Sequence, residues 1–376
     1  MTLPELANEL DLTKQAVSYY EKGTRQPGID SLVKLQHLFG VPRDFFFTDQ
    51  PTTGTSEKIL YRSLKSTTKK SRTYLQRKLD WFQIMAEFLQ EQIVFPEVKI
   101  PNDPIDPTSS DFARIDRIAL KYRKSWGLGT GPIKNMVALL ENLGVVVGRA
   151  NFDKASKVDG FSLWNPLDLR PYVLLNDFKL VGPRSRFDAA HELGHLILHQ
   201  ELAREECFTV SPSYTNIENQ AHRFASSFLL PPEALQREMT YPSLATFIGL
   251  KNKWKVSVKM IMKKCRDLNL ITADHYRNLS IHYSRKKWNS GEPLDDTIPV
   301  ERPQFLRRSV ELLLTEGVLS PEELRYTFPY PVADIEELLG LDNGFLERDR
   351  SVQPTLKTPL NNVIPFKNGR NEPWKK

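Results

Sequence analysis

The sequence predicts an α+β protein with a small N-terminal helical unit, a central domain containing a small sheet, and a C-terminal helical region. Three patterns predict this class. Apolar residues recur at helical spacing in residues 1–48 and 236–345. Three short β-prone runs lie between these regions, at 144–148, 160–164 and 172–175. A helix with the pattern His-Glu-x-x-His at 191–195 follows these strand-prone runs, as expected for a buried helix.

Composition restricts the class of protein further. The 376 residues suffice for two or three domains, and the 40% hydrophobic and 26% charged residues are typical of a globular chain. No run approaches the ~18 apolar residues of a membrane helix, and no secretory signal pattern occurs. The two cysteines, Cys207 and Cys265, do not predict a disulfide framework. We therefore expect a cytoplasmic protein.

The positive charge is concentrated just after the first helical unit. The formal net charge is +6, which is compatible with a nucleic-acid partner. Between Lys58 and Leu79 there are eight basic residues and no acidic residue, whereas residues 1–50 carry five basic and seven acidic residues. If the first unit binds DNA, the stretch from Lys58 to Lys78 is expected to help hold phosphates.

Residues 1–48 read as three short helices. Thr2 and Glu5 have the spacing of a capping box, and Asp11 tolerates the left-handed turn that follows the first helix. Thr13 can cap a second helix. A third helix is predicted at 31–39, where a glycine follows.

This pattern resembles the Xre/Cro-type helix-turn-helix family. The resemblance is carried by Leu6-Ala7, Thr13–Glu21, Gly23, Pro27 and the helix from Leu32 to Gly40. In that family the second of these helices enters the major groove, which implies that Lys14, Gln15, Ser18 and Tyr19 face DNA and that Val17 is core. Family members usually have a preceding helix, so we expect either that the unit is trimmed and lacks its first helix or that the start codon was chosen downstream of the true one. The alternative to DNA binding is that this unit is a relic used for dimerisation or partner contact.

The central motif is His191-Glu192-Leu193-Gly194-His195. Residues i and i+4 share one face of a helix, so two imidazoles can bind one ion while Glu192 takes a proton from a water on it. Ser185 is predicted to cap this helix, and its apolar residues give it a buried side. The alternative is a surface helix with a fortuitous histidine pair.

A catalytic zinc usually has a third protein ligand. His199 lies two turns, about 12 Å, beyond His191 and is too far away, so we expect a hydrogen-bonded role for it. Glu201, Glu205 and Glu206 lie in the loop that follows and are possible ligands, but nothing in the sequence directs them toward the two histidines. Glu218 borders the apolar stripe of a helix predicted from Thr215 to Phe228. Thr215 and Glu218 equally form a capping box, so spacing alone leaves the choice open.

A second resemblance bears on this choice. The residues Arg184-x-Arg186-Phe187, Ala190–His195, His199, Glu218-x-x-Ala221-x-x-Phe224-Ala225 and Leu229-Leu230-Pro231 look like the ImmA/IrrE metallopeptidase family. The resemblance implies that His191, His195 and Glu218 bind the metal, with Glu192 as catalytic base. Zinc is the implied metal, with manganese as the alternative. Asp188 and His222 depart from the family's usual Thr and Asn. His222 is either a contact to the transition state or a partly exposed helix residue.

Together the two resemblances imply a bacterial or phage regulator: a zinc endopeptidase that cleaves a Xre-type repressor, with DNA and a homodimer as further partners. The rival is a DNA-binding regulator or antitoxin-like module whose peptidase fold only senses. The expected organisation is a helix-turn-helix unit, a linker with a basic helical region, a zincin-like domain, a helical region and a disordered tail, at 1–50, 51–104, 105–235, 236–345 and 346–376.

Overall fold

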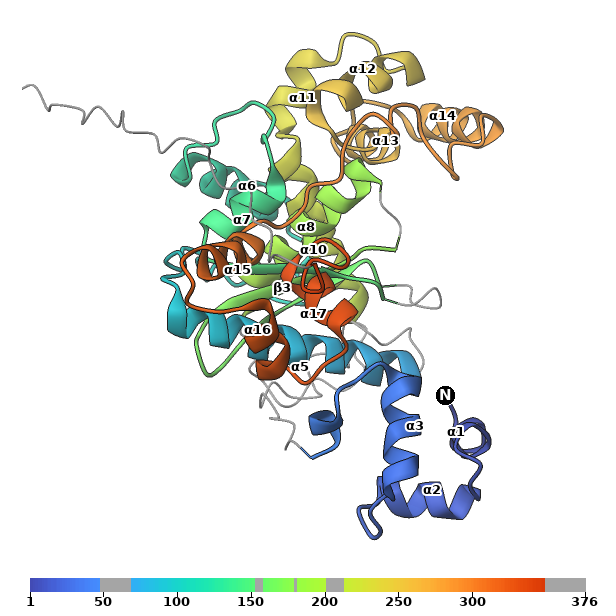
Figure 1. Cartoon of the computed structure of the whole chain (residues 1–376). Helices are drawn as coiled ribbons and strands as arrows, with labels where there is room; N and C mark the ends of the chain where they lie inside the picture. The colour runs from blue at the N-terminus through green and yellow to red at the C-terminus, as the bar shows by residue number, and fades with distance from the viewer. Residues whose placement is uncertain (48–68, 153–157, 179–180, 201–212, 349–376) are drawn as a thin grey trace, which may run out of the picture. The chain divides into compact units, whose positions relative to one another are not determined.

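The computed structural model describes residues 1–47, 69–152, 158–178, 181–200 and 213–348 (Figure 1). Several expectations fall outside these residues: the linker at 49–57, Lys58, Arg62, Lys65, the acids Glu201, Glu205 and Glu206, Cys207, and the tail beyond Arg348. Among the described helices, none combines the length and the apolar character needed to span a membrane.

The N-terminal unit consists of α1 (Leu3–Glu9), α2 (Lys14–Glu21), α3 (Ile29–Phe39) and the short 3-10 helix η1 (Arg43–Phe46). Thr2 and Glu5 form the expected capping box, and the Thr13 hydroxyl accepts a hydrogen bond from the third residue of α2. Asp11 has the left-handed φ of 55° that the turn requires. The unit encloses a small core of Ala7, Leu10, Val17 and Leu35.

The central sheet has three strands in the order β1-β3-β2: β1 (Val146–Ala150), β3 (Pro171–Asn176) and β2 (Gly160–Trp164). β1 runs parallel to β3, and β2 runs antiparallel to it. β1 begins two residues later than predicted, because Gly144, with a φ of +82°, turns the chain out of the preceding helix α7 (Met136–Asn142). β2 and β3 lie where the sequence predicts them.

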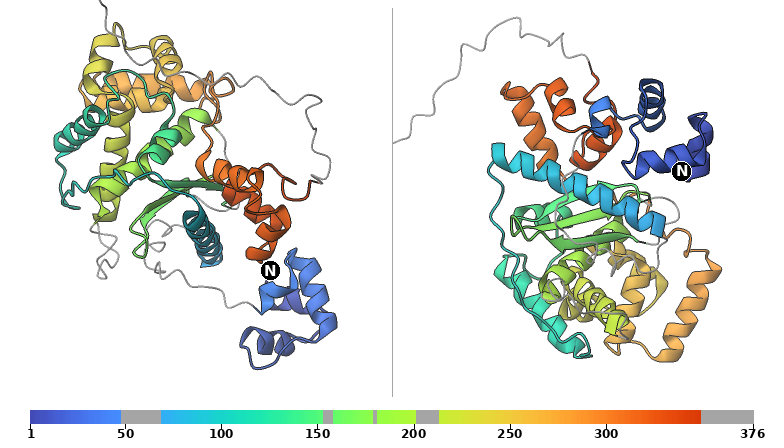
Figure 2. Two further views of the ribbon diagram at one scale, coloured as in Figure 1. Left: turned by 60° about the vertical axis from the view of Figure 1, so that its left-hand side comes forward. Right: turned by 90° about the horizontal axis from the view of Figure 1, so that it is seen from below.

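Helices cover both faces of the sheet (Figure 2). Alternate strand residues belong to two cores: Val146 and Leu174 pack with α5 (Lys69–Gln92), while Val147 and Val173 pack with α8 (Gly182–Leu198). The approach of α5 is close, because a β-carbon on Gly148 would lie 2.6 Å from the Phe82 ring. Both faces of the central strand are therefore buried.

α8 packs against α10 (Ser213–Leu229), and α6 (Phe112–Ser125) packs against α10. A β-carbon on Gly194 would lie 3.3 Å from Ala221, so these small residues bring the two helices together. Ser185 does not cap α8, contrary to prediction. Pro183 starts the helix one turn earlier, its N-cap is Val181, and Ser185 is buried inside it. α10 begins two residues before Thr215, so Thr215 is not its N-cap either.

The C-terminal region is helical, as expected. Its helices are α11 (Pro232–Glu238), α12 (Leu244–Trp254), α13 (Val258–Asp267), α14 (Ala273–Arg285), α15 (Phe305–Thr315), α16 (Pro321–Thr327) and α17 (Val332–Leu339). Residues of α11 to α14 join the core on the α8 side of the sheet, whereas residues of α15 to α17 join the core around α5.

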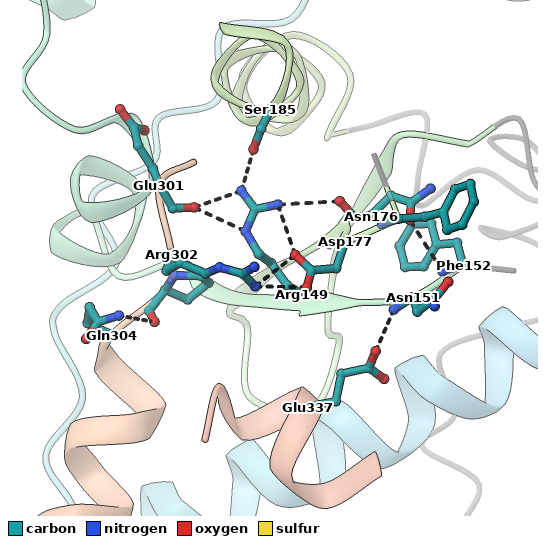
Figure 3. A network of polar contacts seen from close by, with 12 residues as sticks. Arg149, Asn151, Phe152, Asn176, Asp177, Ser185, Glu301, Arg302, Gln304 and Glu337 are labelled. Atoms are coloured by element: carbon teal, nitrogen blue, oxygen red, sulfur yellow. Dashed lines mark hydrogen bonds and ion pairs between the residues drawn. The ribbon is translucent and has the colours of Figure 1, made fainter. Parts of the chain in front are cut away.

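Polar contacts attach the returning C-terminal segment to the edge strand β1 and to the end of β3 (Figure 3). The buried Arg149 guanidinium donates to the Glu301 carbonyl oxygen over 2.8 and 3.1 Å and also to Ser185. Arg302 donates to both carboxylate oxygens of Asp177 at 2.9 Å. Burial lowers the pKa of Arg149 to about 10. These contacts fix the edge of the sheet beside α8.

Candidate metal centre

The two histidines of the motif lie on one face of α8, as their spacing requires. Their Nε2 atoms are 3.0 Å apart. Glu218 reaches them from α10: its Oε2 is 3.3 Å from His191 Nε2, and its Oε1 is 3.5 Å from His195 Nε2. The three ligand atoms all lie within 4.8 Å of one another. Two helices that are separate in sequence thus direct three donors at one point.

This donor set fits a divalent cation of the zinc type. Two imidazole nitrogens and one carboxylate oxygen are a common set of protein ligands for a catalytic zinc. Burial opposes ionisation of Glu218, but the hydrogen bond from His191 and the nearby imidazoles outweigh it and lower the pKa of Glu218 to about 2. Burial also lowers the pKa of His195 well below 6.5. A carboxylate and a neutral imidazole are the forms that bind metals.

Glu192 lies between α8 and strand β2. Its side chain is buried, and its Oε2 accepts a hydrogen bond from the Ser162 hydroxyl at 2.7 Å. A β-carbon on Gly160 would lie 3.5 Å from the Glu192 Oε1 atom, so the strand is close. Burial raises the pKa of Glu192 to about 7, although His191 and Ser162 partly offset this effect. The carboxyl group is therefore oriented by the neighbouring strand.

His199 lies behind His195, outside the group of three ligand atoms. Its Nδ1 is 3.0 Å from His195 Nδ1, and its Nε2 is 2.8 Å from the Oε1 atom of Gln220. The hydrogen-bonded role expected from its distance to His191 is confirmed. Burial lowers the pKa of His199 to about 4.

The four residues that the first resemblance assigns to DNA lie on α2. Lys14, Gln15 and Tyr19 are exposed and Ser18 is half-buried. The Gln15 amide donates to the Tyr19 hydroxyl at 2.9 Å. Val17, on the opposite side, is 1% exposed, as expected for a core residue. The residues thus share an accessible face.

The basic stretch contributes less to such a face than its sequence suggests. Lys78 is 2% exposed and forms ion pairs with Asp334 and Glu337 of α17. Its neighbour Arg77 is 3.6 Å from Asp80. Lys78 therefore does not help to hold phosphates as expected for this stretch, because its ammonium group neutralises acids inside the fold.

Comparison with known families decides what these two regions are. A peptidase family model described as IrrE N-terminal-like domain matches residues 140–266, which include the motif helix and Glu218. The chain contains an IrrE-like peptidase domain. A helix-turn-helix model matches residues 1–46, so the chain also contains a helix-turn-helix domain. A search of curated proteins finds no match. The two domains imply a protein substrate and a DNA partner, respectively.

His222 and Asp188, the two residues that depart from the pattern expected from the resemblance, lie near the candidate metal ligands. The His222 ring centroid is 4.4 Å from that of His191, and its Nδ1 is 2.6 Å from the Glu218 carbonyl oxygen, to which it must donate. In neutral His222 the Nε2 atom therefore carries no hydrogen and cannot donate to an oxyanion. The contact of His222 with the substrate oxyanion stays a prediction, and it requires a protonated ring. Asp188 is half-buried, and burial raises its pKa to about 8.

Sequence reasoning missed Ser162 and Gln220. Gln220 is fully buried on the same apolar stripe of α10 as Ile217, Ala221 and Phe224. A polar residue on such a stripe needs hydrogen-bond partners, and this signal could have identified it. Ser162 and Gly160 both lie on the face of β2 that is next to α8. Nothing in the sequence pattern of the strand marks Ser162 as a functional residue.

A cavity of about 870 Å³ lies elsewhere in the fold, between β1, α5, α15 and α17. Its lining includes Arg149, Arg302 and Lys78 but none of the three residues of the metal centre. The Arg302 and Lys78 charges are already paired with Asp177 and with acids of α17. We therefore place the candidate site of the IrrE-like domain at the three converging donor atoms and not in this cavity.

Proposed function

We propose that this chain is a zinc-dependent endopeptidase that acts in the cytoplasm together with DNA-binding regulation. Its substrate would be a Xre-type repressor, whose cleavage derepresses stress or mobile-element genes. The convergence of His191, His195 and Glu218 beside the buried Glu192 is the observation that carries this proposal. Manganese is the alternative metal for such a ligand set.

The side chains have distinct parts in this mechanism. His191, His195 and Glu218 would hold the cation, which supplies Lewis acidity that polarises a peptide carbonyl and acidifies water. Glu192 accepts a proton from the water that attacks the carbonyl carbon and delivers it to the amine nitrogen when the C–N bond breaks. Ser162 holds the Glu192 carboxylate in place by its 2.7 Å hydrogen bond.

β2 is an edge strand of the sheet and passes beside Glu192. An extended substrate segment could add to this edge by main-chain hydrogen bonds. On the helix-turn-helix domain, Lys14, Gln15, Ser18 and Tyr19 are proposed to contact DNA in the major groove. Gln pairs well with adenine and Lys with guanine, so these residues offer base readout.

The variant Glu192→Gln tests the proposal. Zinc-loaded full chain would be incubated with purified Xre-type repressors encoded beside its gene, and new termini would be detected by mass spectrometry. The wild type is expected to cleave a repressor, whereas Glu192→Gln is expected to keep one equivalent of zinc and lose cleavage.

Three outcomes would contradict parts of this proposal. Cleavage by Glu192→Gln at the wild-type rate would show that Glu192 is not the base. A wild type that binds zinc and leaves every such repressor intact would favour the regulator whose peptidase fold only senses. A stable complex without proteolysis would favour the antitoxin-like module.

A further inference from the structure

A series of hydrogen bonds runs from the carbonyl oxygens of a loop through Gln220 and His199 to His195. Gln220 of α10 is fully buried, and its side-chain Nε2 donates to the carbonyl oxygens of Asp106 and Ser109, each at 2.9 Å. Carbonyl oxygens only accept, and an amide nitrogen has two hydrogens, so both are used here. A flipped amide would place its oxygen against two carbonyl oxygens. The loop therefore fixes which end of the Gln220 amide faces His199.

The end that faces His199 is the amide oxygen. Gln220 Oε1 is 2.8 Å from His199 Nε2, and because an amide oxygen only accepts, His199 Nε2 must carry the hydrogen. His199 is 6% exposed and touches no carboxylate through either ring nitrogen in the described residues, so the ring is neutral. Its Nδ1 is then a bare acceptor.

The same argument passes to the metal centre. His199 Nδ1 is 3.0 Å from His195 Nδ1, so His195 must carry its hydrogen on Nδ1. Its Nε2 is consequently bare, and this is the atom that lies 3.5 Å from Glu218 Oε1. A metal ligand needs this lone pair. By contrast, His191 Nδ1 is buried and has no hydrogen-bond partner among the described residues.

We propose that Gln220 and His199 are positioning residues that fix the tautomer of His195, so that its Nε2 lone pair faces the metal position before the metal binds. This inference rests on the proposed metal site. Partners behind a histidine ligand orient the ring and set its tautomer, and their loss typically weakens metal binding 10–100-fold.

The chain offers a matched control for the other role of Gln220, which is to anchor the loop. Asn216 lies one helical turn before Gln220, and its Nδ2 donates to the carbonyl oxygens of Pro107 and Ser109 at 2.7 and 2.8 Å. It holds the same loop with the same kind of group, but it is not a hydrogen-bond partner of His199. Asn216→Ala thus removes hydrogen bonds that anchor the loop and keeps the hydrogen bond between Gln220 and His199.

The test measures zinc affinity and the histidine tautomer in the full chain. Metal-free protein would be titrated with Zn²⁺ in competition with a chromophoric chelator. Gln220→Met, which keeps the size but removes the acceptor, is expected to bind zinc roughly 10–100-fold more weakly, and Asn216→Ala about as tightly as wild type. Long-range proton–nitrogen NMR of metal-free wild type is expected to show the His195 hydrogen on Nδ1, and of Gln220→Met a mixture of both tautomers.

Several results would overturn the inference. One is wild-type zinc affinity in Gln220→Met, and another is an equal loss in Asn216→Ala, which would assign the effect to the loop. A His195 hydrogen on Nε2 in the metal-free wild type would overturn it without any variant, even if Gln220→Met failed to fold. Absence of zinc binding by wild type would refute the proposed function instead, while the tautomer measurement would still decide this inference.

Discussion

The candidate metal centre and the side of α2 that we propose to contact DNA are built in opposite ways. Lys14, Gln15 and Tyr19 are exposed and come from one short segment. The donors of the metal centre come from two helices, and behind one of them further buried groups are hydrogen-bonded in line. Changes at separate exposed residues usually add, whereas changes within a buried network couple. A substitution at the candidate metal centre should therefore change the effects of substitutions at its neighbours, whereas the effect of a substitution on α2 should stay local.

The largest effect is expected from removing a ligand. Glu218→Ala should weaken zinc binding more than about 100-fold, beyond the range seen for residues that only support a ligand, because the carboxylate completes the donor set. Competition titration measures the affinity. A chelator should abolish wild-type cleavage, and added Zn²⁺ should restore it.

Glu233→Ala, the same change at an exposed glutamate of α11, is the control and should bind zinc normally. Full zinc affinity in Glu218→Ala would break the comparison, since the third ligand would then lie elsewhere, for example among Glu201, Glu205 and Glu206.

A smaller effect is expected where β2 supports the base. Ser162→Ala removes the 2.7 Å hydrogen bond to Glu192, which should lower kcat while leaving zinc affinity unchanged. The expected loss is about tenfold, equivalent to roughly 1.4 kcal/mol of barrier. Ser280→Ala removes a hydroxyl that donates to a backbone carbonyl of α14 and should not alter the rate. An unchanged rate in Ser162→Ala would remove β2 from the mechanism.

The next effect concerns DNA. Gln15→Ala should weaken binding to a duplex selected from a random pool by about tenfold, within the roughly 1–3 kcal/mol of a specific base contact. Fluorescence anisotropy measures this at fixed salt, with Gln26→Ala, an exposed residue after α2, as control. Zinc affinity should not change. If the wild type binds no duplex, the domain serves dimerisation or partner contact instead.

The smallest effect is expected from the cap of α2. Thr13→Ala removes the side-chain acceptor for the Ala16 N–H and should cost the helix about 1 kcal/mol. Hydrogen exchange of the α2 amides should accelerate about fivefold. Thr13→Ser keeps the oxygen and should exchange as wild type does. Faster exchange in α8 as well would show that the two regions are coupled after all.

Local chemistry explains which elements were predictable. The Thr2 capping box, the left-handed Asp11 and the pairing of His191 with His195 all depend on residues within four positions of one another. Helix geometry fixes such relations wherever the helix lies. The same kind of reasoning failed at Ser185, because Pro183 started the helix earlier and Arg149 of a distant strand took the hydroxyl.

The sequence by itself determined the motif helix, the short strands, the helices of the N-terminal unit and, through the resemblance, the choice of Glu218. Only the tertiary structure decided that Ser162 holds Glu192, that Gln220 backs His199, and that Lys78 is buried against α17. Each of these contacts joins elements that are far apart in the chain. Their existence depends on how helices and sheet pack, and helical or strand periodicity carries no information about the partner across a packed interface.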